Sequence, residues 1–332
     1  MEQQDNIYSS VLPWDNLSHA KIFITGATGL IGGELVDMFM RNPFRDYEIY
    51  ASARNITRLT SRFAEYAGVH GFHVMKYDVS EPLVSDVNFQ YIIHAASNAS
   101  PNFFRSNPVE VMKSNIFGVT HLLDYGRTHG LKRMLYVSSG EVYGEGNGEI
   151  FKETDSGYVD CASRRACYPS SKRAAETLCI SYSEEYGLET VIARLCHTYG
   201  SRFTEEDNRA YAQFLRNATQ GKNIVLNSKG IQRRSWLYVK DCAQALLYLL
   251  LKGQSTQAYN VANGQENMSI DEFARVIAEV YGVSVQYDIP EHDSSNVGIQ
   301  QALFSTQKIE ALGWKPKYSV LEGIREIMGN SK

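Results

Sequence analysis

The sequence has no apolar run long enough to cross a membrane, and it carries no excess of positive charge. A membrane-spanning helix needs about 20 consecutive apolar residues. The formal net charge of −4 gives no electrostatic reason to expect a nucleic acid or an anionic membrane as partner. Residues 1–16 are polar and acidic, without the basic start and apolar middle of a signal peptide. We therefore expect a soluble, cytoplasmic protein.

Cysteine is also scarce, and its placement argues against a disulfide framework or a metal centre. The chain has five cysteines, which are Cys161, Cys167, Cys179, Cys196 and Cys242. The number is odd, there is no C-x-x-C spacing, and the interval between Cys161 and Cys167 matches no common zinc pattern. We expect reduced thiols, as is usual in the cytosol, and no bound metal.

In the first half of the chain, short apolar segments alternate with longer amphipathic ones, which predicts βαβ units. Expected strands cover residues 21–25, 48–51, 72–76, 91–94, 134–137 and 189–194, and expected helices cover 30–40, 109–129 and 170–185. This order indicates an α/β fold, a Rossmann-type doubly wound parallel sheet covered on both faces.

After about residue 197 the pattern becomes mostly helical. Expected helices cover residues 210–220, 239–251, 270–281 and 320–328, with short strands such as 223–226 between them. A chain of 332 residues often forms two lobes. We predict an N-terminal extension at 1–20, a dinucleotide-binding domain at 21–197 and a substrate lobe at 198–332. The last boundary is a soft one, across which elements can be exchanged.

A glycine-rich turn follows the first expected strand and opens the first expected helix. It reads Gly26-Ala-Thr28-Gly29-Leu30-Ile31-Gly32. Glycines allow the backbone N–H groups to approach a pyrophosphate, and the helix directs its positive N-terminus at the same group. The turn therefore predicts a dinucleotide site.

The second expected strand bears on the choice of cofactor. NAD enzymes usually end this strand with an acid that binds the ribose 2′-hydroxyl. Here it ends Tyr50-Ala-Ser-Ala-Arg54-Asn55, without an acid, and Arg54 could pair with a 2′-phosphate. This favours NADP(H) and leaves NAD(H) possible. The alternative for Arg54 is a solvated surface arginine.

Tyr168 and Lys172 lie four residues apart in an expected helix, so they share one face. An ammonium beside a phenol stabilises the phenolate and lowers its pKa, so the tyrosine can exchange a proton with a substrate oxygen. Ser139, at the end of the strand MLYVSS, could hydrogen-bond that oxygen, with Ser138 as the fallback.

Together these motifs resemble the extended branch of the short-chain dehydrogenase/reductase superfamily. The resemblance implies that Asp78, and Val79 beside it, contact the adenine, although Asp78 could instead cap a turn. It also implies that the segment His94-Ala95-Ala96-Ser97 passes the nicotinamide ribose and the substrate, and that Asn115 is the family's helix-bending asparagine. The segment Val137-Ser-Ser139-Gly140-Glu141-Val-Tyr143-Gly resembles the family's catalytic serine region.

Later segments resemble the nucleotide-sugar enzymes of this branch. Residues 214–226 look like their nucleotide-contacting helix and strand, and 233–241 like their R-x-F-x-Y-V-x-D segment, which would place Arg234 on the diphosphate. His197 stands where the family usually has a substrate-contacting asparagine, unless it is only a packing histidine. The resemblance further implies a homodimer formed through the helices at 109–129 and 170–185.

The resemblance leaves several reactions open, all centred on C4 of the sugar. Gly140 occupies the place of the acid in dTDP-glucose-type 4,6-dehydratases, whereas Glu141 fits the glutamate of the UDP-glucuronate decarboxylase segment T-S-E-V-Y-G. With the cofactor argument, we expect an NADPH-dependent reductase of a dTDP-4-keto-6-deoxyhexose, which makes deoxysugars for O-antigen or other surface polysaccharide. Alternatives are a UDP-glucuronate decarboxylase, an epimerase or dehydratase that recycles NAD, and a non-catalytic cofactor-sensing protein.

Overall fold

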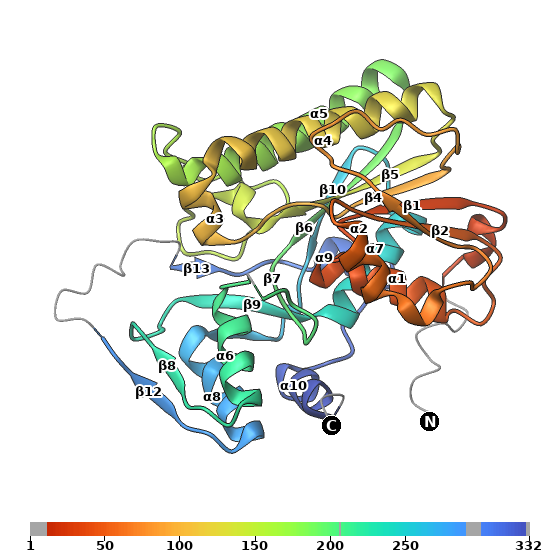
Figure 1. Ribbon diagram of the computed structural model, residues 1–332. Helices are drawn as coiled ribbons and strands as arrows, with labels where there is room; N and C mark the ends of the chain where they lie inside the picture. The colour runs from red at the N-terminus through yellow and green to blue at the C-terminus, as the bar shows by residue number, and fades with distance from the viewer. Residues whose placement is uncertain (1–11, 206, 290–299, 330–332) are drawn as a thin grey trace.

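The computed structural model describes residues 12–205, 207–289 and 300–329, which form a large α/β part and a smaller part beside it (Figure 1). The large part contains a parallel sheet of seven strands in the order β10-β6-β5-β4-β1-β2-β3. Its strands are β1 (Lys21–Thr25), β2 (Glu48–Ala53), β3 (Phe72–Lys76), β4 (Tyr91–His94), β5 (Arg133–Ser139), β6 (Glu189–Leu195) and β10 (Gln257–Val261). The Rossmann-type fold predicted from the sequence is confirmed.

Helices cover both faces of this sheet, as its almost wholly apolar central strands require. On one face α1 (Leu30–Arg41) packs beside α7 (Val239–Lys252), and on the other α4 (Pro108–Thr128) packs along α5 (Cys167–Tyr186) (Figure 1). The short helices of this part are α2 (Ile56–Arg62), α3 (Pro101–Ser106) and α9 (Gln307–Glu310). The predicted helices agree with these bounds to within a few residues, whereas α2, α3, α9 and β10 were not predicted.

The order of the strands places the ligand-binding edge. The chain leaves β1 toward β2 on one side and later returns to β4 on the other side, so the crevice lies beyond the carboxyl ends of β1 and β4. Ligands bind at such a switch point in open α/β sheets. The glycine-rich turn follows β1 directly and therefore opens onto this crevice.

Two segments cross the boundaries expected from the sequence. Helix α7 and strand β10 follow residue 198, yet α7 covers the large sheet and β10 pairs with β6 as its edge strand. Residues 12–20 also pack on the large part, because Leu12 and Leu17 are buried in its core and Trp14 stacks on Tyr47. Residues 1–11 of the expected extension lie outside the described residues.

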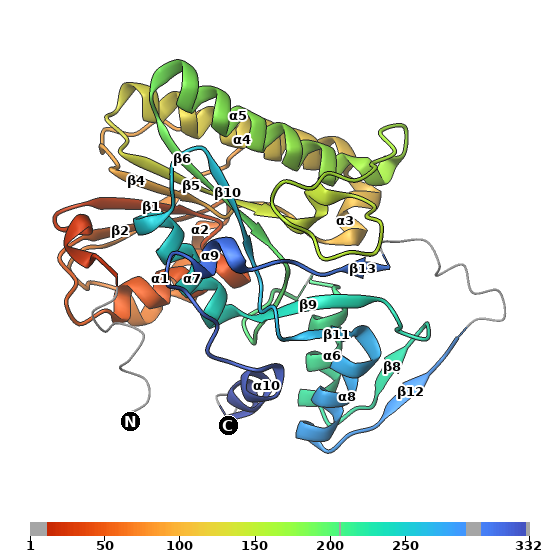
Figure 2. The ribbon, with the colours of Figure 1, turned by 180° about the vertical axis from the view of Figure 1, so that it is seen from behind.

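The smaller part has a hydrophobic core of its own. Its helices and strands lie below the large part in Figure 2. Strand β9 (Arg233–Tyr238) pairs with β7 (His197–Tyr199), β11 (Asn267–Ser269) and β13 (Gln301–Ala302), while β8 (Ile224–Leu226) pairs with β12 (Val285–Tyr287). Helices α6 (Ala210–Thr219), α8 (Ile270–Tyr281) and α10 (Val320–Gly329) pack around them, and Trp236 stacks on Phe273 at 3.8 Å. No helix within the described ranges is long and apolar enough to span a bilayer.

Candidate active site

The glycine-rich turn is packed too tightly for side chains at two of its positions. Gly26 has φ +71°, and a Cβ there would lie 2.8 Å from the Ala95 carbonyl oxygen and from the Ala96 nitrogen. A Cβ on Gly32 would lie 2.3 Å from the Gly26 carbonyl oxygen. Helix α1 begins at Leu30 with Gly29 as N-cap and without a side-chain cap. Its first N–H groups are therefore available to a pyrophosphate.

The three other predicted residues of the turn differ in their exposure to solvent. Thr28 and Ile31 are partly exposed, in the turn and in the first turn of α1. Leu30 is buried and packs into the core of the smaller part, so the cofactor turn is fixed to both parts of the molecule.

The residues predicted to face the adenosine lie beyond β2 and β3. Arg54 directly follows β2, is well exposed, and forms a 3.3 Å ion pair with Glu110 of α4. Asp78 accepts hydrogen bonds from the backbone N–H and the hydroxyl of Ser80 at 3.0 and 2.8 Å, so it does cap a turn. Val79 is buried against α4, where its carbonyl contacts the His121 ring.

The segment after β4 is fastened to β1 and to α5 by hydroxyl and amide groups. The Ala96 N–H donates to the Thr25 hydroxyl at 3.2 Å. The Ser97 hydroxyl donates to Asn115 Oδ1 at 2.9 Å, and Asn115 Nδ2 donates to Ser171 Oγ at 2.9 Å. Asn115 therefore joins the β4 end to the helix that carries Tyr168.

Helix α5 and strand β5 bring the predicted catalytic side chains together. Tyr168 is 5% exposed and stacks on Phe104 at 4.5 Å. Ser139 and Ser97 lie near enough to its phenol to lower its pKa, against the larger effect of burial. Lys172 is buried, and its Nζ donates to the Val137 carbonyl at 2.9 Å, with the Tyr168 ring centroid 5.8 Å away. The fallback residue Ser138 points elsewhere, because its hydroxyl donates to Glu176.

One expectation about these groups needs correction. Burial raises the pKa of Tyr168, against the opposing effects of Ser139 and Arg209. Burial also lowers the pKa of Lys172 to about 7, while Glu176 opposes this. The predicted lowering of the Tyr168 pKa by Lys172 is not found in this structure, because the ammonium is hydrogen-bonded to the backbone and the phenol is almost fully desolvated.

The two residues after Ser139 are engaged with other parts of the chain. A Cβ on Gly140 would lie 2.3 Å from Cζ of Phe304, which follows β13, so this aromatic ring occupies the space of a side chain at position 140. Glu141 forms an ion pair with Arg165, whose Nη2 donates to both carboxylate oxygens at 2.7 Å.

On the substrate side, His197 and Arg234 lie near each other and near an arginine that the sequence did not indicate. The His197 side chain is exposed to solvent. Partial enclosure by protein, together with the nearby charges of Arg234 and Arg209, lowers the pKa of its ring below the ordinary value, so the ring is neutral at physiological pH. Arg209 is held by Asp207 and Tyr211, and its charge acts on Tyr168 as well. An arginine just before a helix resembles an ordinary solvated residue, so no sequence signal marked it.

The described residues contain no group of three or more metal-ligating side chains, and all five cysteines are free thiols. The candidate site is therefore built from the glycine turn, a Ser–Tyr–Lys set and a cationic wall formed by Arg209 and Arg234. Such a set can move a proton at a substrate oxygen beside a dinucleotide.

Comparison with known proteins identifies the family of the chain. Residues 22–262 match the family described as the NAD dependent epimerase/dehydratase family, and the chain belongs to it. UDP-glucuronic acid decarboxylase 6 of Arabidopsis thaliana is 33% identical over 307 residues, covering 92% of this chain and 87% of that protein. UDP-glucuronic acid decarboxylase 1 of Xenopus tropicalis is 31% identical over 315 residues, covering 93% and 71%.

Solved structures of similar fold include a dTDP-glucose 4,6-dehydratase from Bacillus anthracis in complex with NAD. It has a TM-score of 0.79 at 21% identity and covers 93% of this chain and 96% of that one. An epimerase from Methanothermobacter thermautotrophicus has a TM-score of 0.83 at 19% identity, covering 98% and 95%. At these identities the likeness concerns the fold. The predicted assignment to short-chain dehydrogenase/reductase enzymes is confirmed by the family match.

Proposed function

We propose that the protein is an NADP(H)-dependent reductase of a nucleotide-linked 4-keto-6-deoxyhexose, such as a dTDP-linked one. The observation that carries this proposal is the position of Phe304 over Gly140. At the position of Gly140, dTDP-glucose-type dehydratases have an acid, and the decarboxylase segment T-S-E has a serine. Neither side chain fits at position 140 unless Phe304 moves, and simple reduction at C4 is the reaction that needs no side chain there.

The end of β2 supports NADP(H) over NAD(H). Arg54 is exposed beside α2 (Ile56–Arg62), and no carboxylate from β2 itself is available for a ribose 2′-hydroxyl, because its only acid, Glu48, lies at the start of the strand. A 2′-phosphate would compete with Glu110 for Arg54, and bidentate guanidinium–phosphate pairing is strong. A net reductase consumes its cofactor, which agrees with a site that selects NADPH.

In the proposed reaction the chain's own residues position the substrate and move one proton. NADPH supplies the hydride when it is bound. Tyr168 donates its phenolic proton to the C4 oxygen, and the Ser139 hydroxyl fixes that oxygen beside the phenol. Lys172, as an ammonium, donates hydrogen bonds to the cofactor ribose and so orients it. Arg234 and the neutral His197 contact the diphosphate and sugar, and Glu141 reaches the sugar when it leaves Arg165.

A UDP-glucuronate decarboxylase that recycles NAD is the second candidate, and two observations favour it. Relatives named as UDP-glucuronic acid decarboxylases match the chain at 29–33% identity along more than nine-tenths of its length. In addition, the cationic wall of Arg209 and Arg234 near Tyr168 could hold a carboxylate as well as a diphosphate. In that version Glu141 would contact the C5–C6 region of the glucuronate.

We further propose that two copies associate through α4 and α5 in the cytoplasm. Apolar side chains are exposed along α4, at Val109 (64%), Met112 (39%) and Phe117 (46%). A self-complementary apolar helix pair is a common basis for a two-fold dimer. Light scattering should give a mass of about twice the chain's 37.4 kDa; a monomeric mass would refute this arrangement.

Parallel assays distinguish the two candidate reactions. Purified protein is mixed with NADPH and enzymatically made dTDP-4-keto-6-deoxyglucose, while a second tube contains NAD and UDP-glucuronate. We expect keto-sugar-dependent loss of NADPH absorbance and no carbon dioxide. Carbon dioxide from UDP-glucuronate without NADPH loss would replace the proposal by the second candidate. A Tyr168→Phe variant serves as control, because it should be inactive in whichever tube responds.

A further inference from the structure

Glu176 lies one helical turn beyond Lys172 on α5, in line with Tyr168 and Lys172 at intervals of four residues. It is only 7% exposed. A buried carboxylate is costly unless charged and polar groups satisfy it. The interaction partners of the Glu176 carboxylate therefore indicate its role in the protein.

Strand β5 supplies the first partner. The Ser138 hydroxyl donates to Glu176 Oε1 at 2.5 Å. Ser138 stands between Val137, whose carbonyl accepts a hydrogen bond from the Lys172 ammonium, and Ser139, the predicted catalytic serine. The hydrogen bond to Glu176 thus fixes Ser138, and with it the position of its two neighbours in the active site, Val137 and Ser139.

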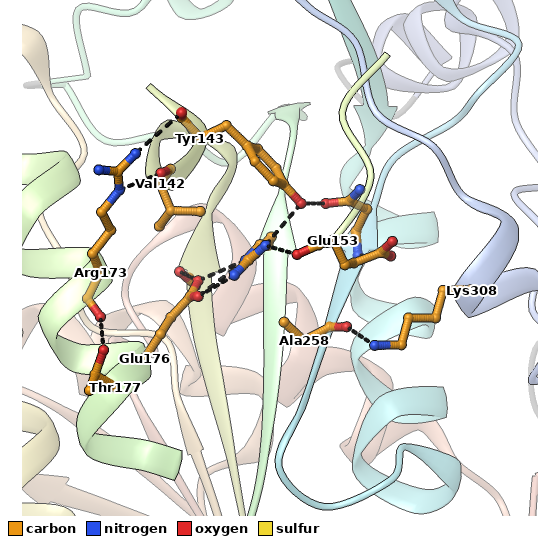
Figure 3. Close-up of polar contacts among 11 residues, drawn as sticks. Val142, Tyr143, Glu153, Arg173, Glu176, Thr177, Ala258 and Lys308 are labelled. Atoms are coloured by element: carbon orange, nitrogen blue, oxygen red, sulfur yellow. Dashed lines mark hydrogen bonds and ion pairs between the residues drawn. The ribbon is translucent and has the colours of Figure 1, made fainter. Parts of the chain in front are cut away.

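Strand β6 supplies the second partner. Arg194 donates to Glu176 from Nε at 3.1 Å to each oxygen and from Nη2 at 2.7 Å (Figure 3). Its remaining Nη1 donates to Tyr143 Oη and to the Glu153 carbonyl, and Tyr143 Oη donates to Asn260 Oδ1 at 2.6 Å. The pair is thereby built into a wider polar network.

A cavity of about 490 Å³ reaches this network from a side other than Tyr168. Its lining includes Glu176, Arg194, Arg173 and Thr177, whereas Tyr168, Lys172 and Ser139 are not part of it among the described residues. Arg173 is committed to backbone carbonyls, those of Val142, Tyr143 and Gly157. Water in this cavity can therefore reach the Glu176–Arg194 pair without passing through the substrate site.

The charged and titratable groups around Lys172 single out Glu176 as its nearby carboxylate. On its own helix these groups are Tyr168, Glu176 and Cys179, and on the strands they are Tyr136 of β5, His94 of β4 and Arg194 of β6. The cavity is lined by Glu153, Asp155 and Arg173, and Lys308 donates to the carbonyl of its lining residue Ala258. His94 is buried and neutral, since burial lowers its pKa to about 3. A buried ammonium without a negative neighbour tends to lose its proton.

We propose that Glu176 is a positioning residue, which holds the end of β5 through Ser138 and supplies the counter-charge that keeps the buried Lys172 an ammonium. Arg194 holds the Glu176 carboxylate in place, and the cavity hydrates this pair from outside the substrate site. The proposal depends on the proposed function only in that Lys172 must be charged to orient the cofactor ribose beside Tyr168.

Titration of lysine side chains by NMR tests the proposal without any substrate. The full-length protein is labelled with ¹³Cε-lysine, and Lys172→Met assigns the signal that titrates near neutral pH. Glu176→Gln keeps the size and hydrogen-bonding reach of the side chain but removes its charge. We expect the Lys172 midpoint to fall by about one pH unit or more. The matched control is Asp155→Asn, which removes a charge from the same cavity and should leave the midpoint unchanged.

A midpoint unchanged in Glu176→Gln, or shifted equally in Asp155→Asn, would overturn the proposal. If Glu176→Gln alone does not fold, Glu176→Gln with Arg194→Gln removes the whole pair and should also lower the midpoint. Replacing both members of a buried pair is better tolerated than removing one. In single-turnover assays, a midpoint one unit lower should reduce the rate at pH 7.5 by roughly eightfold. Failure of the substrate assays would leave the titration result intact, so the two proposals fail separately.

Discussion

The contact between Gly140 and Phe304 predicts a specific cost for the change of Gly140 to serine. The new Cβ would lie 2.3 Å from Phe304 Cζ and 2.6 Å from Cε1, where ordinary contacts are 3.4–4 Å. The ring must therefore retreat by about 1 Å. Phe304 is 3% exposed and packs against Tyr143 and Phe151, with ring centroids 5.7 and 6.0 Å away, so it has little room.

Overpacking of this kind costs about 1–3 kcal/mol of the free energy of unfolding. For a chain of this size each kcal/mol lowers Tm by roughly 2 °C, so we expect a fall of about 2–6 °C by differential scanning calorimetry. The control is a double-mutant cycle with Phe304→Leu, whose shorter side chain makes room for the serine. Gly140→Ser should cost markedly less in the Phe304→Leu background. An equal cost in both backgrounds, or no cost in the wild-type background, would refute the packing argument.

Three further predictions concern the cofactor turn, cofactor choice and pH. Gly32→Ala should abolish thermal stabilisation by NADPH because its Cβ would lie 2.3 Å from the Gly26 oxygen, whereas Gly29→Ala, at 3.2 Å, should weaken it less; equal effects would contradict this. Arg54→Ala should weaken NADPH binding by roughly tenfold to a hundredfold and spare NADH, as measured by nicotinamide fluorescence; equal loss for both would remove Arg54 as selector. Burial raises the pKa of Asp241 to about 6, although the N–H groups of Lys317 and Tyr318 donate hydrogen bonds to its carboxylate. The contribution of Asp241 to the free energy of unfolding is therefore largest at low pH, and it is lost as the pH rises from about 4 to 6. Denaturant titrations should therefore show the stability of Asp241→Asn relative to wild type rising by about 2 kcal/mol between pH 4 and pH 7; a constant difference would contradict the assignment.

The parts of the site that are local in sequence could be predicted from it. The turn from Gly26 to Gly32 lies within one strand–helix connection, and Tyr168 and Lys172 lie within one helix, so spacing alone relates their positions. The strands that carry these residues are apolar runs between turn signals, which is why their bounds agree closely with the structure.

The parts that depend on tertiary packing could not be predicted. Phe304 lies far along the chain from Gly140, and nothing near either residue indicates their contact. Arg209 reaches the site because α6, which follows it, packs with α8 and β8 in the core of the smaller part. The role of Glu176 depends on Ser138 and Arg194, which lie on two separate strands. The exchange of β10 into the large sheet is likewise a matter of topology, which a helical pattern after residue 198 does not reveal.

The proposed hydride transfer to C4 is tested most directly by isotope labelling. The enzyme is incubated with dTDP-4-keto-6-deoxyglucose and NADPH carrying deuterium at the transferable position of the nicotinamide, and the sugar product is examined by NMR and mass spectrometry. We predict one deuterium per product molecule, located at C4, with one equivalent of NADP formed. Product without deuterium, or a sugar converted while the cofactor is unchanged in amount, would contradict net reduction and indicate a recycled cofactor.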